Sequence, residues 1–334
     1  MTAEAQQPLV SVRGLKKHFP VAQSLVDKVL SRQALAVRAV DGVDFDIYPG
    51  ETLGLAGESG SGKTTTGRLV LRLLEPTAGT ILFDGQDITH WPEDQLRPLR
   101  RRMQPIFQDP TASLNPRMTI GQAIAHGLRI HRLAADAAEE RHQVLDILAK
   151  VGLTPPEQFL NKYPHQLSGG QRQRAVIARA LVLRPDLVVA DEPIAMADVS
   201  VRAVLLQLMR DLQREFGLTY LFITHDLATA KYICDRIAIM YLGKIVEIGP
   251  LSQVYGNPRH PYTQALLAAV PIPDPEARRE KALPKGEIPS PIHPPAGCRF
   301  HPRCPLAQEI CRTQEPRLHP VEGEPDHWVA CHFR

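Results

Sequence analysis

The most informative stretch of this 334-residue chain is Gly57-Glu-Ser-Gly-Ser-Gly62-Lys63-Thr64. It fits the pattern G-x-x-x-x-G-K-[ST], follows a short apolar segment at 52–56 that is typical of a strand, and precedes a helix predicted from Lys63 to about Leu74. Glycines at these positions let backbone N–H groups converge on phosphate oxygens, and the start of the helix adds a favourable dipole. The stretch, called the P-loop below, therefore predicts a site for nucleotide phosphates.

The segments on either side of the P-loop alternate between strand-like and helix-like patterns. Val43, Phe45 and Ile47 alternate with polar residues, and Asp84-Gly85 is typical of a hairpin turn. The pattern from about 96 to 152 is mostly helical, with 126–150 as its longest stretch. Further strands are predicted at 80–83, 187–190, 218–223, 236–242 and 244–248, and a helix over 201–212 ended by Gly217. This alternation predicts an α/β core with a largely parallel sheet.

Two carboxylates end one of these strands, in Leu187-Val-Val-Ala190-Asp191-Glu192. The tip of a strand beside a P-loop is where an aspartate holds Mg²⁺, and we assign that role to Asp191. Glu192 is suited to orient or deprotonate an attacking water. The pattern thus favours hydrolysis of a nucleotide triphosphate.

Composition excludes several other classes of protein. The formal net charge is only +3, so charge does not indicate a nucleic-acid partner. No apolar run approaches the roughly 18 residues of a membrane span. The first eight residues are polar and contain no apolar core of a secretory signal, so we expect a cytosolic chain.

Three further motifs carry a resemblance to a known family. Leu167-Ser168-Gly169-Gly170-Gln171 matches the signature of ABC-type ATPases, Gln108 resembles their Q-loop glutamine, and His225 resembles their switch histidine. With the P-loop and Asp191-Glu192, these motifs stand in the family's order between residue 11 and about 250. The resemblance implies an α/β P-loop ABC-type nucleotide-binding domain at 1–255, with a helical subdomain at about 96–175.

The resemblance also implies the roles of individual residues. Two cassettes dimerise head to tail, so that the signature of one caps the γ-phosphate held by the P-loop of the other. Catalysis is expected from Glu192 and His225, and Mg²⁺ ligation from Thr64, Gln108 and Asp191. The residues expected to contact ATP are Phe19, which resembles the aromatic that stacks on adenine, with Gly57, Glu58, Ser59, Gly60, Ser61, Gly62, Lys63, Thr64, Thr65, Gln108, Ser168, Gly169, Gly170, Gln171 and Asp198.

One loop departs from the family's pattern. The D-loop, residues 193–198, is Pro-Ile-Ala-Met-Ala-Asp, where the common form is P-T-S-A-L-D. Asp198 is retained, whereas the serine and leucine are not. Because this loop communicates between the two sites of the dimer, a related but different partner subunit is one way to accommodate it.

Two segments, 243–250 and Asn257-Pro258-Arg259-His260-Pro261-Tyr262-Thr263, are similar to the oligopeptide/dipeptide importer branch of the family. This resemblance implies a peripheral ATPase on the cytoplasmic face of the membrane that energises peptide uptake, although the branch also carries oligosaccharides and nickel. The implied partners are two membrane permeases, a second ATPase (identical or related) and an extracytoplasmic substrate-binding protein. The alternative is a soluble, non-transport ABC ATPase in repair, translation or cluster assembly.

The tail, residues 256–334, is rich in proline and contains Cys298, Cys304, Cys311 and Cys331. Chain so dense in proline is expected to be loop-rich and to need a staple. The cysteine spacing does not fit the C-x₂-C pairs of a zinc ribbon, yet four thiolates can hold zinc or an iron–sulfur cluster. Some ATPases of the branch carry a [4Fe-4S] cluster on a similar tail. We therefore predict such a cluster here, with Zn²⁺ as the alternative.

Overall fold

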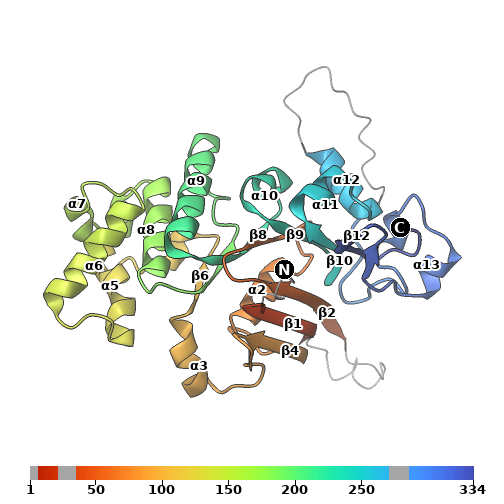
Figure 1. Ribbon diagram of the computed structural model, residues 1–334, viewed down its shortest axis with the longest axis horizontal. Coiled ribbons are helices and arrows are strands. Elements are labelled where there is room, and N and C mark those ends of the chain that lie inside the picture. The colour runs from red at the N-terminus through yellow and green to blue at the C-terminus, as the bar shows by residue number, and fades with distance from the viewer. Residues whose placement is uncertain (1–6, 22–34, 271–285) are drawn as a thin grey trace, which may run out of the picture. The chain divides into compact units, whose positions relative to one another are not determined.

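The computed structural model describes residues 7–21, 35–270 and 286–334. The chain divides into two compact units whose elements are labelled in Figure 1. Unit 1 comprises Met1–Ile47, Thr52–His90 and Ile223–Arg334, and unit 2 comprises Tyr48–Glu51 and Trp91–Phe222. The tail therefore belongs to the same compact unit as the P-loop.

Unit 1 contains an antiparallel sheet in the order β2-β1-β4-β5. Its strands are β1 (Val10–Pro20), β2 (Ala36–Ile47), β4 (Ala78–Phe83) and β5 (Gln86–Asp87). Val43, Phe45 and Ile47 of β2 are buried, which confirms the predicted alternation. Asp84 and Gly85 join β4 to β5 at positive φ, 52° and 75°, so the predicted hairpin turn is also confirmed.

A second sheet contributes five neighbouring strands to unit 1, in the order β3-β9-β10-β12-β11. These strands are β3 (Thr52–Ala56), β9 (Arg236–Tyr241), β10 (Lys244–Pro250), β11 (His319–Val321) and β12 (Glu324–Val329). The helices of unit 1 are α2 (Lys63–Val70), α10 (Leu227–Ile233), α11 (Leu251–Gly256), α12 (Pro261–Ala269), α13 (Glu309–Thr313) and the 3₁₀ turn η2 (His301–Arg303). Only β3 and β9 pair in parallel among these strands. The parallel pair β3–β9 belongs to the predicted α/β core, whereas the hairpin β9–β10 and the tail strands β11 and β12 add antiparallel pairs to it.

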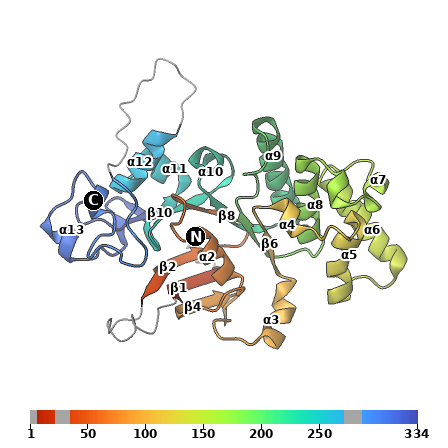
Figure 2. The same ribbon diagram turned by 180° about the vertical axis from the view of Figure 1, so that it is seen from behind.

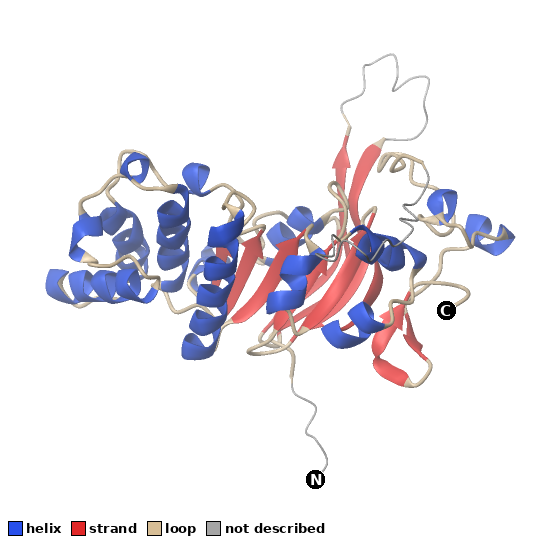
Figure 3. Cartoon of the chain, turned by 90° about the horizontal axis from the view of Figure 1, so that it is seen from above, coloured by secondary structure: helices blue, strands red, loops and turns tan. Residues whose placement is uncertain are grey.

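Unit 2 combines strands in the order β8-β7-β6 with helices. The strands are β6 (Met103–Ile106), β7 (Leu187–Asp191) and β8 (Thr219–Thr224), whose last two residues lie in unit 1. The helices are α3 (Glu93–Arg100), α4 (Pro110–Ser113), α5 (Ile120–His131), α6 (Ala137–Lys150), α7 (Glu157–Leu160), η1 (Pro164–Gln166), α8 (Gly169–Leu181) and α9 (Val199–Phe216). Figure 2 shows α5, α6, α7 and α8 side by side, and Figure 3 draws this part of unit 2 as helices joined by loops.

The structure corrects two predictions for 96–152. The expected single helical stretch at 126–150 is two helices, because Arg132 adopts a left-handed conformation (φ 53°) after α5 and Asp136 caps the start of α6. The segment also contains strand β6, which pairs in parallel with β7. Sequence patterning missed β6 because it is short and contains Pro105, which the edge position of this strand tolerates.

The tail is mostly loop, as expected, but one of its strands joins the sheet of the cassette. Strand β12 pairs antiparallel with β10, with Glu247 opposite Val329 and Ile248 opposite Trp328. The tail thereby extends the sheet that contains β3, the strand that precedes the P-loop.

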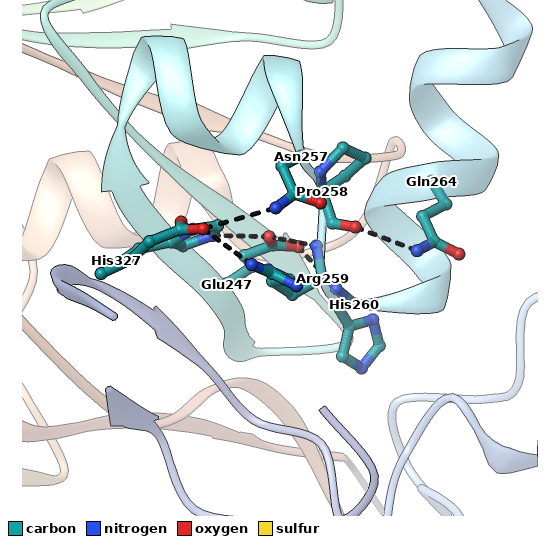
Figure 4. Close-up of polar contacts among 8 residues, drawn as sticks. Glu247, Asn257, Pro258, Arg259, His260, Gln264 and His327 are labelled. Carbon is teal, nitrogen blue, oxygen red and sulfur yellow. Dashed lines mark hydrogen bonds and ion pairs between the residues drawn. The ribbon is translucent and has the colours of Figure 1, made fainter. Parts of the chain in front are cut away.

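A buried polar cluster fastens this junction (Figure 4). The carboxylate of Glu247 is fully buried and accepts hydrogen bonds from the backbone N–H groups of Arg259 (2.7 Å) and His260 (2.9 Å). The His327 imidazole bridges two carboxylates, with Nε2 2.8 Å from Glu247 and Nδ1 2.7 Å from Glu324. Arg259 also donates to Glu324, at 2.7 Å. The cluster thus joins β10, the loop at 257–260 and β12.

The two carboxylates set the charge of His327. Burial lowers the pKa of this imidazole, but its hydrogen bonds to Glu247 and Glu324 outweigh burial and leave the pKa above its ordinary value of 6.5. A raised pKa stabilises the fold fully below pH 6.5, and this contribution is lost as pH rises through the folded-state pKa. The pKa of His260 shifts in the opposite direction, because burial lowers it to about 4.

We expect His327→Gln to lower the free energy of unfolding by about 2–4 kcal/mol at pH 6, because it leaves two carboxylates without their shared cation. The difference in unfolding free energy between variant and wild type should shrink as pH rises to 9. His260 is present in both proteins, so its titration does not affect this difference. Urea unfolding of both proteins across this range measures the effect. His90→Gln, on the exposed surface, is the matched control. A difference that does not change with pH would contradict the assignment.

Candidate functional site

The P-loop connects the buried strand β3 to helix α2, as the sequence predicts. Helix α2 begins at Lys63, after Gly62 has taken a left-handed conformation with φ 107°. The loop also has positive φ at Gly57 (152°) and Gly60 (77°), which glycine adopts readily. The predicted helix ends four residues earlier than expected, at Val70.

Two P-loop glycines are required by neighbouring backbone. A Cβ atom on Gly57 would lie 2.1 Å from the carbonyl oxygen of Met240, and one on Gly62 would lie 2.1 Å from that of Ala39. Gly60 differs, because a Cβ atom there would have no heavy atom within 4 Å. Strands β9 and β2 therefore hold the loop at both ends and leave its middle exposed.

The amine of Lys63 lies inside the loop. The residue is only 5% exposed, and its Nζ donates to the carbonyl oxygens of Gly57 (2.8 Å) and Glu58 (2.9 Å). A buried cation surrounded by a turn of backbone at a helix start is suited to bind a phosphate. Thr64 and Thr65 are half-buried on the first turn of α2.

In unit 2, Asp191 ends strand β7 and is buried, and Glu192 follows it with φ 48°. A positive φ is unusual for glutamate and occurs at functional sites. The amide Nε2 of Gln108 donates to Glu192 Oε2 at 3.1 Å. The structure thus joins the predicted Q-loop residue directly to the predicted general base.

The signature residues form the start of helix α8. Ser168 is its N-cap, and a capping box links the Ser168 hydroxyl to the N–H of Gln171 (3.3 Å) and the Gln171 side chain to the N–H of Ser168 (3.1 Å). Ser168 and Gly169 are exposed. The helix start therefore faces solvent, which suits a site completed by a second molecule.

The remaining predicted residues lie on other elements. Phe19 is half-buried in β1, with Lys17 Nζ 5.2 Å from its ring centre. His225 is exposed directly after β8. Asp198 is exposed at the N-cap of α9, and the preceding D-loop presents Met196, which is 65% exposed. Arg202 holds that loop by donating to the carbonyl oxygen of Ala197 at 2.9 Å.

Each unit thus brings part of the predicted set together. Unit 1 holds Phe19, the P-loop with Thr65, and His225, and unit 2 holds Gln108, the signature, Asp191, Glu192 and Asp198. Sequence patterning missed two tail residues that contact the P-loop, Tyr262 and Arg303. Tyr262 lies in the segment 257–263 that resembles the importer branch, but no pattern in the sequence links it or Arg303 to the P-loop.

The four tail cysteines are free thiols. Among residues 7–21, 35–270 and 286–334, no group of three or more His, Cys, Asp or Glu side chains is arranged to hold a metal ion. The thiols are nevertheless neighbours: burial, with a contribution from Cys311, Cys304 and Cys331, raises the pKa of Cys298 to about 11. The arrangement as it stands therefore gives no support to the predicted zinc or iron–sulfur site.

Comparisons with known proteins agree with the motifs. The family profile for the ABC transporter matches residues 40–195, and that for the oligopeptide/dipeptide transporter C-terminal region matches 246–311. A putative peptide import ATP-binding protein of Brucella ovis is 51% identical over 98% of both chains. The oligopeptide transport ATP-binding protein AppF of Bacillus subtilis is 49% identical over 100% of this chain and 99% of that protein.

Solved structures share the fold. The ATP-binding cassette MJ0796, in a dimeric post-hydrolysis state bound to ADP and Pi, superposes with a TM-score of 0.63 and is 30% identical. The similarity covers 72% of this chain and 98% of that one. Within the described ranges, no helix is both long and apolar enough to cross a membrane.

We expect Gly62→Ala to lower the free energy of unfolding by more than about 3 kcal/mol, because backbone blocks the added Cβ and the φ is unfavourable. Gly60→Ala is the matched control, with positive φ but open space, and should cost about 1 kcal/mol. Chemical denaturation of both variants compares them. Equal losses would show that close approach does not constrain the loop.

Proposed function

The chain belongs to the ATP-binding proteins of ABC transporters, in the branch with an oligopeptide/dipeptide transporter C-terminal region, and we propose that it hydrolyses ATP to drive the import of peptides. The observation that carries this proposal is the buried Lys63 amine, encircled by P-loop backbone at a helix start. The assignment of peptides as the cargo rests on the names of relatives that are similar to this chain over both the cassette and the tail.

The donor set fits MgATP. Lys63 would bind the β- and γ-phosphates, and the N–H groups of residues 58–65 would surround them. The Thr64 hydroxyl, the Gln108 amide oxygen and the Asp191 carboxylate are the hard oxygen donors that Mg²⁺ prefers. When bound, Mg²⁺ neutralises charge that develops on the phosphates. Phe19 is proposed to stack on the adenine.

Hydrolysis then depends on Glu192. This carboxylate is proposed to orient and deprotonate the attacking water, with Gln108 fixing its position through the 3.1 Å hydrogen bond. His225 is proposed to donate to the γ-phosphate.

The exposed signature and D-loop support assembly with a second ATPase. Ser168, Gly169, Gly170 and Gln171 are proposed to cap ATP bound to the partner, with Asp198 beside them. Met196 would contribute an apolar contact to that interface. The departure of the D-loop from the common P-T-S-A-L-D sequence favours a related, non-identical partner.

The complete importer is proposed to contain two permeases and an extracytoplasmic substrate-binding protein, with this chain peripheral on the cytoplasmic face. We retain the domain boundaries at 1–255 and 256–334 as part of the proposal. Oligosaccharide or nickel remains the alternative cargo. The relatives do not favour the non-transport alternative in repair, translation or cluster assembly.

We expect Glu192→Gln to lower ATP hydrolysis by about 10² or more while MgATP binding persists, because the amide cannot accept the proton of water. ATPase activity and peptide uptake are measured on the complex purified through a tag on this chain from gently solubilised membranes. Glu215→Gln, a surface substitution in α9 of the same unit, is the matched control.

Normal turnover in Glu192→Gln would contradict its role as the base. Purification of the wild-type chain without permeases, or with hydrolysis that peptides do not stimulate, would overturn the import function.

The iron–sulfur proposal rests on the spacing of the four cysteines and on the resemblance of this tail to the cluster-carrying tails of the branch. If the tail binds a [4Fe-4S] cluster, anaerobically purified protein should contain about four iron atoms per chain and absorb visible light. Elemental analysis measures iron and zinc together. Finding one zinc and no iron would favour the zinc site over the cluster. Finding neither metal would reject both sites.

A further inference from the structure

The tail segment 298–304 contains two buried arginines, and each forms an ion pair with an acid of the cassette. Arg299 contacts Asp41 of β2, and Arg303 contacts Glu58 of the P-loop. Both arginine side chains are only 7% exposed. Buried cations are costly unless paired, so these two contacts determine where the tail segment lies.

Arg303 binds Glu58 through two parallel hydrogen bonds. Its Nη1 lies 2.9 Å from Glu58 Oε2 and its Nη2 lies 3.1 Å from Oε1. The guanidinium also lies 5.8 Å from the ring centre of Tyr241 and 5.9 Å from that of Phe300. A bidentate pair of this kind fixes the orientation of the carboxylate as well as its charge.

Tyr262 binds the same P-loop residue through the backbone. Its fully buried hydroxyl accepts a hydrogen bond from the N–H of Glu58 at 2.9 Å. Tyr262 is positioned in turn by His260, whose Nδ1 accepts from the Tyr262 N–H at 3.0 Å and whose own N–H donates to Glu247. The tail therefore holds both the backbone and the side chain of Glu58.

Glu58 occupies a sensitive position in the loop. It follows Gly57, and its carbonyl oxygen accepts from Lys63, the proposed phosphate-binding amine. A free carboxylate here would repel phosphate oxygens and compete for the lysine. Pairing with Arg303 neutralises that charge and turns the carboxylate toward the tail.

We propose that Arg303 is a positioning residue of the nucleotide site, which acts through Glu58 and makes ATP affinity depend on the docked tail. This inference rests on the proposed ATP-binding function. It gives the tail a part in the binding of nucleotide, beyond the stability of the fold.

The test is equilibrium binding of MgATP to the full chain in a double-mutant cycle of Glu58→Gln and Arg303→Met. We expect Arg303→Met to raise the Kd about tenfold, the order expected of one uncompensated charge near a phosphate. Adding Glu58→Gln should restore most of this loss, because it removes the charge that Arg303 neutralised. Arg303→Lys, which keeps the charge but not the bidentate geometry, should be intermediate.

Arg312→Met, an exposed arginine of the same tail, is the matched control. A purely structural role for Arg303 predicts loss of affinity that Glu58→Gln does not restore, and that result would overturn the proposal. Unchanged affinity in Arg303→Met would also overturn it. If Arg303→Met does not fold, Arg303→Lys with and without Glu58→Gln makes the same comparison. Failure of the wild-type chain to bind MgATP would instead refute the proposed function.

Discussion

The close approach of the P-loop to neighbouring strands is the constraint on which the nucleotide site depends. Carbonyl oxygens of Met240 and Ala39 lie where a Cβ atom of Gly57 or Gly62 would be. Because side chains are excluded at these points, the loop backbone can turn tightly enough to place Lys63 inside it. The start of helix α2 and the buried amine then form one electropositive cradle.

The same unit contains a second constraint, the buried charge of Glu247. This carboxylate has two backbone donors from the loop at 259–260 and one imidazole from β12. A buried carboxylate without these partners would be strongly unfavourable, so the cassette and the tail must pack together. That packing carries Tyr262 and Arg303 to the P-loop, and it explains why the tail belongs to the same compact unit as the P-loop.

Local patterns predicted much of the fold correctly. Strand β3, the start of α2, the hairpin at Asp84-Gly85 and the end of α9 at Gly217 each depend on neighbours in sequence. The errors have two causes, a distant strand partner and a local backbone conformation that the residue type does not indicate. Strand β6 contains a proline and is stable only beside β7, and the break after His131 depends on a single left-handed residue, Arg132. The metal prediction, which rested on cysteine spacing and on a resemblance to cluster-carrying tails, stays a prediction, because spacing does not fix the relative positions of thiols in space.

The sequence by itself determined the proposed chemistry of this protein, because the residues assigned to it lie within short motifs. The glycines, lysine and threonine proposed to bind phosphate and Mg²⁺ lie within one loop and one helical turn, and Asp191 ends a strand that Glu192 follows. Only the tertiary structure decided what surrounds that chemistry. Tyr262 and Arg303 reach Glu58 across separations of 204 and 245 residues, and the pairing of β10 with β12 brings the tail back to the cassette. Contacts over such distances depend on the whole path of the chain and the burial of its charges, which no local pattern encodes.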